Sequence, residues 1–156
     1  MALNSDLVTQ FRILINDNDV TQSWTDTQLS QFLCIGASQL NAYLLGLEIS
    51  FVISFSDLLI TPDPHDTALT NPIVEQLLLL KSAENLNDAE IKKLYASSGY
   101  KISDDKSTID TTSMSKSLES RGKMYKGRFE TLLMWYLRNS RGDGCAVATP
   151  FLNAGY

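Results

Sequence analysis

Hydrophobic residues near the start of the chain recur at helical spacing, at Leu7, Phe11, Leu14 and Ile15. This spacing predicts a helix from residue 4 or 5 to about 16, which a polar run then ends. Thr25 followed by Gln28 is typical of a capping box, and Gly46 is typical of the position just past a helix end. We therefore expect a second helix over roughly 26–45.

The period of the pattern then changes from 3.6 to 2. Apolar side chains alternate with mostly polar ones at Ile49, Phe51, Ile53 and Phe55. Such alternation predicts a strand, but no equally clear partner strand lies nearby, so an extended arm over about 48–64 is the alternative. Pro62 and Pro64 close this segment, because proline is not accommodated inside a helix.

Two helices are predicted between residues 71 and 99. Asn71 followed by Pro72 is typical of a helix start, and the apolar residues after it cover most of the circumference, as in a central helix of a bundle. Asn87 or Asp88 is expected to cap a separate, shorter fourth helix that ends at Gly99.

The longest predicted helix covers about 113–141. Its apolar stripe keeps a spacing of four and three over five turns, at Leu118, Gly122, Tyr125, Phe129, Leu132 and Tyr136. Before it, an insert at about 100–112 contains two short β-prone pieces that predict a small hairpin. After it, the irregular, apolar-studded tail 143–156 is expected to dock on a partner.

These elements predict a mainly α protein. We expect a helical bundle of about four to five helices with a long C-terminal helix, an extended strand-like arm or small hairpin, and an irregular tail. Residues 1–142 would form one helical domain and 143–156 a docking tail. A chain of 156 residues with 44% hydrophobic side chains is large enough to bury a core without disulfides or metals.

Composition excludes several classes of protein. One histidine and two widely separated cysteines do not supply a zinc site or a secreted disulfide framework, so a reducing compartment is the simpler expectation. The start MALNSDLVTQ lacks the features of a signal peptide, and no apolar run is long enough to span a bilayer. We expect a soluble protein that is made, or assembled, inside the cell.

Charge is distributed unevenly along the chain. The net charge is −5, yet the segment 113–141 holds seven basic residues against two acidic ones. A basic run of this kind is most often the solvated face of an amphipathic helix; an acidic partner protein is the next interpretation, and DNA follows. Candidate contact residues for either partner are Lys116, Lys123, Lys126 and Arg128.

No motif in the sequence predicts catalysis, a metal or a cofactor. The spacing of Asp17, Asp19 and Thr21 resembles a calcium loop, but the glycine and the chelating glutamate of such a loop are missing. His65 between Asp63 and Asp66 is too small a ligand set for a metal. Phosphate loops, dinucleotide fingerprints and nucleophile elbows are not found in the sequence.

The order of the elements resembles a known family. The segments concerned are the W-T-D-x-x-L start of the second helix, the extended segment ending in prolines, the Leu-rich third helix, the insert Y-K-I-S-D-D-K-S-T-I-D-T-T and the long helix with Tyr125 midway. In the order of these segments the chain resembles the head–tail adaptor proteins of tailed bacteriophages. These proteins are also called head-completion or connector proteins. The resemblance covers about residues 6–141.

The resemblance implies a structural role without an active site or cofactor. Such proteins form a dodecameric ring below the portal protein, extend the channel through which packaged DNA passes, and present a platform to the next neck or tail component. It implies a place at the head–tail junction of the virion, after assembly in the bacterial host cytoplasm, with no contact to membrane. A helical module that binds nucleic acid through the basic helix is the alternative.

Two segments are the candidate contact sites in such a ring. The tail would clasp the portal, with Val147, Phe151, Leu152 and Tyr156 as its apolar contacts. The arm would contact a neighbouring subunit through Ile49, Phe51, Ile53 and Phe55. A ring needs two different faces on each subunit, and these segments are candidates for them.

Overall fold

A computed structural model describes residues 5–17, 22–45, 47, 49–66, 71–98 and 111–140. In this part of the chain the secondary structure consists of the following elements: α1 (Ser5–Ile15), α2 (Asp26–Tyr43), β1 (Val52–Ser54), β2 (Leu59–Thr61), α3 (Pro72–Ser98) and α4 (Thr111–Ser140). The predicted mainly α fold with a long C-terminal helix is confirmed.

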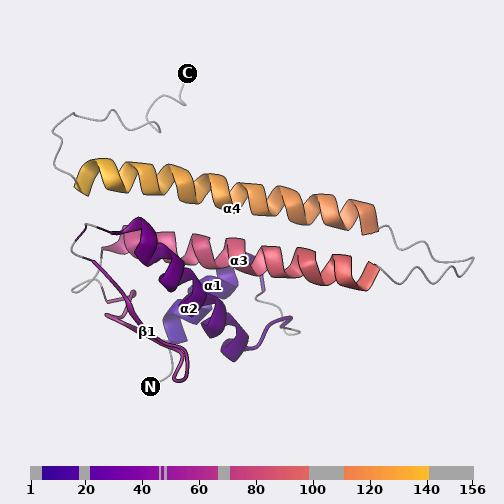
Figure 1. Cartoon of the computed structure of the whole chain (residues 1–156). Helices are drawn as coiled ribbons and strands as arrows, with labels where there is room; N and C mark the ends of the chain where they lie inside the picture. The colour runs from indigo at the N-terminus through magenta and orange to yellow at the C-terminus, as the bar shows by residue number, and fades with distance from the viewer. Residues whose placement is uncertain are drawn as a thin grey trace, which may run out of the picture.

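The elements are arranged around α3. Helix α4 runs antiparallel along one side of α3, and α1, α2 and the β1–β2 hairpin lie on the other side (Figure 1). In the described part of the chain, α4 has its extensive backbone contacts with α3 alone, whereas α3 also contacts α1 and α2. The central position predicted for the third helix follows from this order.

The starts of α2 and α3 are formed by the residues that the sequence indicated. The Thr25 hydroxyl accepts a hydrogen bond from the Gln28 backbone amide at 3.3 Å, and the Gln28 side chain accepts one from the Thr25 amide at 3.0 Å. The Asn71 side chain accepts one from the Ile73 amide at 2.9 Å. These side chains satisfy amides that the first turn leaves without helical partners.

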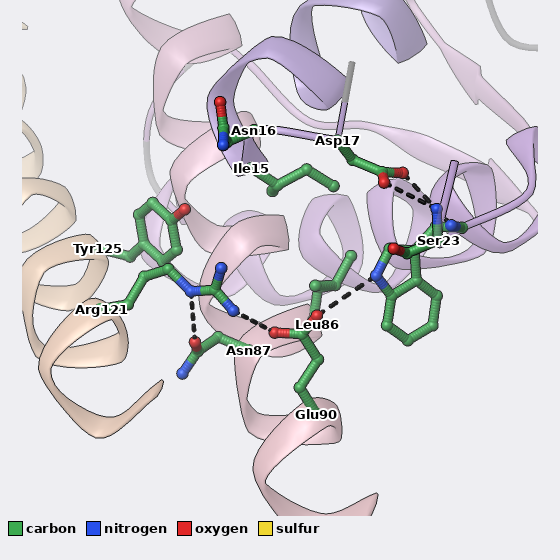
Figure 2. A pocket seen from close by; sticks show the side chains of 10 residues that line it. Ile15, Asn16, Asp17, Ser23, Leu86, Asn87, Glu90, Arg121 and Tyr125 are labelled. Carbon is green, nitrogen blue, oxygen red and sulfur yellow. Dashed lines mark hydrogen bonds and ion pairs between the residues drawn. The ribbon is translucent and has the colours of Figure 1, made fainter. Parts of the chain in front are cut away.

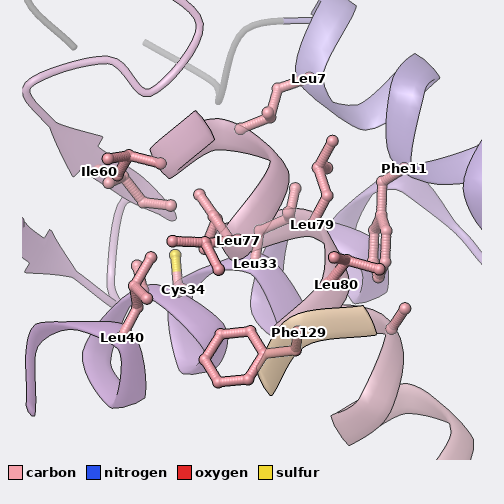
Figure 3. Close-up of a cluster of buried hydrophobic side chains, with 14 of the residues drawn as sticks. Leu7, Phe11, Leu33, Cys34, Leu40, Ile60, Leu77, Leu79, Leu80 and Phe129 are labelled. Atoms are coloured by element: carbon pink, nitrogen blue, oxygen red, sulfur yellow. The ribbon is translucent and has the colours of Figure 1, made fainter. Parts of the chain in front are cut away.

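All four helices and the hairpin contribute to one core. Figure 3 shows Phe11 of α1, Leu33 of α2 and Phe129 of α4 among the side chains gathered around α3. Cys34 is fully buried among them, and burial raises the pKa of its thiol. It therefore occupies the core as a small apolar side chain.

The prediction of a separate fourth helix at Asn87 or Asp88 is wrong. Helix α3 continues unbroken to Ser98. Asn87 is 1% exposed; its side-chain amide donates to the Leu118 carbonyl at 3.0 Å, and its side-chain oxygen accepts from Arg121 Nε at 3.1 Å. Because this side chain is bonded to α4, it does not compete for its own backbone and the helix is not interrupted.

The period-2 segment belongs to a hairpin. Strand β1 pairs with β2 in antiparallel register, with Ile53 opposite Ile60. Two serine hydroxyls near the tip donate to Asp57, and these bonds lower the pKa of its carboxyl. The predicted strand is thus confirmed as part of a small hairpin. Its partner β2 was not evident in the sequence because three residues are too few to show an alternating pattern.

The core stripe of α4 differs from the prediction at its fifth position. Leu118, Tyr125, Phe129 and Tyr136 are buried as expected and Gly122 is half-buried, but Leu133 is buried in place of Leu132, which is only half-buried. A straight helix drifts by about 20° per heptad against a strict seven-residue repeat. Two heptads after Leu118, this drift brings the next residue onto the buried side.

Two predicted features fall outside the described residues. The hairpin expected within 100–112 lies outside the described residues, except for residues 111 and 112, which belong to α4. The tail 143–156 lies entirely outside the described part of the chain.

Candidate interaction surfaces

The outer face of α4 is a long helical surface without a neighbouring element in the described part of the chain. We use this name for the exposed side chains of α4 on the side that points away from α3 and on the two flanks next to it. Charged groups on this face are Lys116, Lys123, Lys126, Arg128, Glu130 and Arg138. Glu119 is exposed as well, but it accepts a hydrogen bond from the Tyr95 hydroxyl of α3 at 3.0 Å. Between the charged groups lie small or flexible side chains, among them Ser120, Met124, Gly127, Thr131 and Met134.

The four basic residues singled out in the sequence are all exposed, but they do not form one track. Lys116 and Lys123 are seven residues apart and therefore lie on the same side of the helix. Lys126 and Arg128 are two residues apart, which rotates them by about 200° to opposite flanks. Glu130 is seven residues from Lys123 and so shares its side, which makes this a mixed surface with a positive excess.

Arg121, which also belongs to the basic run, has a different environment. It forms an ion pair with Glu90 of α3, and its Nε donates to the Asn87 side chain. The Trp24 indole N–H donates to the same Glu90 carboxylate at 3.4 Å. Figure 2 shows these groups converging between α3, α4 and the segment before α2. Arg121 therefore holds α4 against the rest of the molecule.

A cavity of about 120 Å³ lies beside this group, lined by residues of α1, α3, α4 and the turn before α2 (Figure 2). The Tyr125 hydroxyl donates to the Leu14 carbonyl at 3.3 Å, and burial raises the pKa of this phenol. Among the described residues, each buried side-chain nitrogen or oxygen has a hydrogen-bond partner. The polar groups of this cavity thus join four elements to one another.

The arm residues divide between the core and the surface. Phe51 is buried, and Ile49 and Ile53 are half-buried against the core. The Asn41 side chain bonds both the amide and the carbonyl of Phe51, at 2.8 and 2.7 Å. Phe55, at the hairpin tip, is 55% exposed. Of the four predicted contact residues, Phe55 is thus the most accessible to a neighbour.

His65 has a carboxylate partner that the sequence did not indicate. Its Nδ1 lies 2.8 Å from Glu75 Oε1, and its backbone amide donates to Asp63 at 3.0 Å. The hydrogen bond to Glu75 raises the pKa of the imidazole. Since Glu75 is ten residues away and opens α3, only the fold brings the pair together. In the described part of the chain, no group of three or more potential ligands is positioned to hold a metal.

Lys81 occupies an aromatic setting that sequence reasoning missed. Its ammonium lies 5.8 Å from the Tyr43 ring centre and 5.3 Å from that of Phe129, and it pairs with Glu84 at 2.8 Å. The two rings contact each other edge to face. The group joins α2, α3 and α4 where they meet, and the i,i+3 spacing of Lys81 and Glu84 is the one signal of it in the sequence.

Comparisons with known proteins add no relationship. No protein-family profile, curated protein or solved structure matches the chain. The described helices include none with the length and apolar character needed to cross a lipid bilayer. The predicted portal-contact residues of the tail lie outside the described residues, so their role stays a prediction.

Proposed function

We propose that the protein is a structural subunit of the neck of a tailed bacteriophage. Copies of the chain would form a ring that joins the portal protein to the tail machinery and extends the DNA channel. The observation that carries this proposal is the outer face of α4, a 30-residue helix whose backbone neighbour in the described part of the chain is α3 alone. A helix so placed offers a long surface to another subunit.

Apolar side chains on the two sides of α3 support the same role. Val52 and Phe55 of the hairpin are 72% and 55% exposed, and Met124 and Met134 of α4 are 41% and 52% exposed. A ring subunit meets one neighbour with one face and the other neighbour with a different face. The helical architecture agrees with that expected from the resemblance to head–tail adaptors.

In this proposal the remaining contacts are made by the C-terminal tail, by the rim of the ring opposite the portal and by the channel through the ring. The tail 143–156 would dock on the portal, and the opposite rim would receive the next neck or tail component. DNA would pass through without sequence-specific contact. The ring would reside at the head–tail junction after assembly in the host cytoplasm.

The test is binding to the portal protein of the phage that encodes this chain. The full chain is mixed with purified portal, and the complex is analysed by sedimentation and electron microscopy. We expect a ring of copies on one end of the portal. A mixture that sediments as two separate species at micromolar concentrations would contradict the proposal.

A second candidate function is nucleic-acid binding through the outer face of α4. It is favoured by the exposure of Lys116, Lys123, Lys126 and Arg128. Duplex binding would then weaken steeply with salt and would be lost on charge reversal of Lys123 and Lys126. No measurable binding at low salt would eliminate this candidate.

A further inference from the structure

In the described part of the chain, exposed positive charge is confined to α3 and α4. Within the described residues 5–66, Arg12 is the only lysine or arginine, and it is buried in ion pairs with Asp17 and Asp26. The exposed cations of the described residues all belong to α3 and α4: Lys92, Lys93, Lys116, Lys123, Lys126, Arg128 and Arg138. Five of these seven cations lie on α4, so among the described elements this helix carries most of the exposed positive charge.

The opposite side carries exposed carboxylates without exposed cations. We call this side the acidic layer; it comprises α1, α2, the hairpin and the loop to residue 66. Its exposed carboxylates are Asp6, Asp26, Asp57 and Asp66. Serine hydroxyls lower the pKa of Asp57, so this group keeps its charge well below neutral pH.

We infer that the outer face of α4 docks onto the acidic layer of a second copy of this chain. This inference rests on the ring proposed above and names the two surfaces that meet in it. Because α4 and the acidic layer lie on opposite sides of α3 (Figure 1), the contact is head to tail, as a closed ring requires. Complementary charge favours this pairing and disfavours contact between two like faces.

The composition of the outer face favours a protein surface over a nucleic acid as its occupant. Glu130 lies on the same side of α4 as Lys123, where it would repel a phosphate backbone. Gly127 has open space within 4 Å of where a Cβ would stand, so a packed surface can approach the helix closely there. Exposed Met124 and Met134 flank it and can adapt to an irregular partner.

The experiment reverses charge on each surface separately. One variant carries Lys123→Glu and Lys126→Glu on α4, and the other carries Asp57→Lys and Asp66→Lys on the acidic layer. Self-association of the full chain is measured by sedimentation velocity at low salt, with and without portal protein. Each variant alone should associate at least about tenfold more weakly than wild type, since like charges then face each other. An equimolar mixture should regain wild-type association, because the two variants can alternate.

Controls separate this contact from general effects of charge and folding. Lys92→Glu with Lys93→Glu changes net charge as much as the α4 variant does, but on the projecting end of α3, and should leave association unchanged. If the aspartate variant unfolds by circular dichroism, Ser50→Lys with Thr61→Lys places positive charge at two other exposed positions of the acidic layer. An equimolar mixture of this double variant with the α4 variant should also regain wild-type association.

The outcomes distinguish the inference from the proposed function. If both charge-reversed variants still form rings as the wild-type chain does, the inference is overturned, whereas the proposed ring is not. A wild-type chain that neither self-associates nor binds portal under any condition overturns both. Loss of duplex-DNA binding in the α4 variant with self-association unchanged assigns the face to nucleic acid and overturns the inference.

Discussion

Arg12 shows how a single buried charge organises the junction between α1 and α2. Its guanidinium donates to Asp17 at 2.8 Å and to the Trp24 carbonyl at 2.8 Å, and Asp17 accepts in turn from the Ser23 amide at 2.8 Å. Asp17, which opens the calcium-like spacing in the sequence, thus stabilises a turn. A buried ion pair of this kind persists because its polar atoms are all bonded.

Two glycines provide a matched test of packing at single residues. A Cβ at Gly36 would stand 2.2 Å from the Ser82 hydroxyl and 3.2 Å from its amide nitrogen, whereas Gly127 has nothing within 4 Å. Gly36→Ala should therefore destabilise the protein by about 1–3 kcal/mol. Gly127→Ala should stabilise it by about 0.5–1 kcal/mol, because alanine favours an exposed helix interior. Urea unfolding measures both, and equal effects of the same sign would contradict the packing of α2 on α3.

The His65–Glu75 pair predicts a pH dependence of stability. The hydrogen bond to Glu75 raises the folded pKa of His65 above its unfolded value of about 6.5. Its contribution is therefore complete below that pH and is lost as the pH rises through the folded pKa. Glu75→Gln should lower the urea midpoint at pH 6 and have a smaller effect at pH 8.

Asp88→Asn is the control for this pair, since it removes an exposed carboxylate from the same helix. It should shift the midpoint little at either pH. If Glu75→Gln lowers the urea midpoint equally at pH 6 and pH 8, the pair stabilises the fold independently of the imidazole proton, which would contradict this prediction.

At the scale of elements, long periodic segments were predictable and short or tertiary-dependent ones were not. The stripe through Tyr125 and Phe129 and the cap at Thr25 are local signals, so they identified α4 and the start of α2. The continuity of α3 through Asn87 depends on bonds to α4, and strand β2 depends on β1. Neither partner is adjacent in sequence, which is why these two features were missed.

The same limit applies to the candidate surfaces. Exposure of Lys116 and Lys123 followed from their positions off the core stripe. The separation of the basic face of α4 from the exposed carboxylates of α1, α2 and the hairpin depends on how α4 packs on α3, and Glu75 reaches His65 only through the fold. The sequence could identify candidate residues, whereas their grouping required the three-dimensional arrangement.

Phe51 and Phe55 of the hairpin segment allow a test of the contact to a neighbouring subunit that is proposed for the arm. Phe51 is 4% exposed and Phe55 is 55% exposed, although both belong to the same alternating segment. Phe51→Ala should cost about 3–5 kcal/mol of unfolding free energy. Phe55→Ala should change stability by no more than about 0.5 kcal/mol and should weaken ring assembly on the portal. Unchanged assembly in Phe55→Ala would contradict the role of this side chain in subunit contact.

The two sides of the described molecule are unlike. Helix α3 separates a basic helix from an acidic layer, and the interactions of Arg121 and Tyr125 fix α4 in place. A subunit with unlike faces can close a ring, whereas one with a single self-complementary face forms a dimer. The proposed neck role thus depends on the contrast between the two sides of α3.

Deleting residues 143–156 tests the portal contact of the intact protein. We expect the circular dichroism spectrum and melting temperature to stay unchanged, because the described residues already form a core among themselves. Docking to the portal should be abolished. The full-length variant with serine at positions 147, 151, 152 and 156 should behave in the same way. Docking that persists in both variants would contradict the predicted role of the tail.

The most direct test of the central claim is the copy number of this protein in purified virions, measured by quantitative mass spectrometry against the portal protein. A ring that continues the portal requires a stoichiometry close to one copy per portal subunit, and that is the result we predict. Absence of the protein from the virion would contradict the neck assignment and would leave nucleic-acid binding by α4 as the function to pursue.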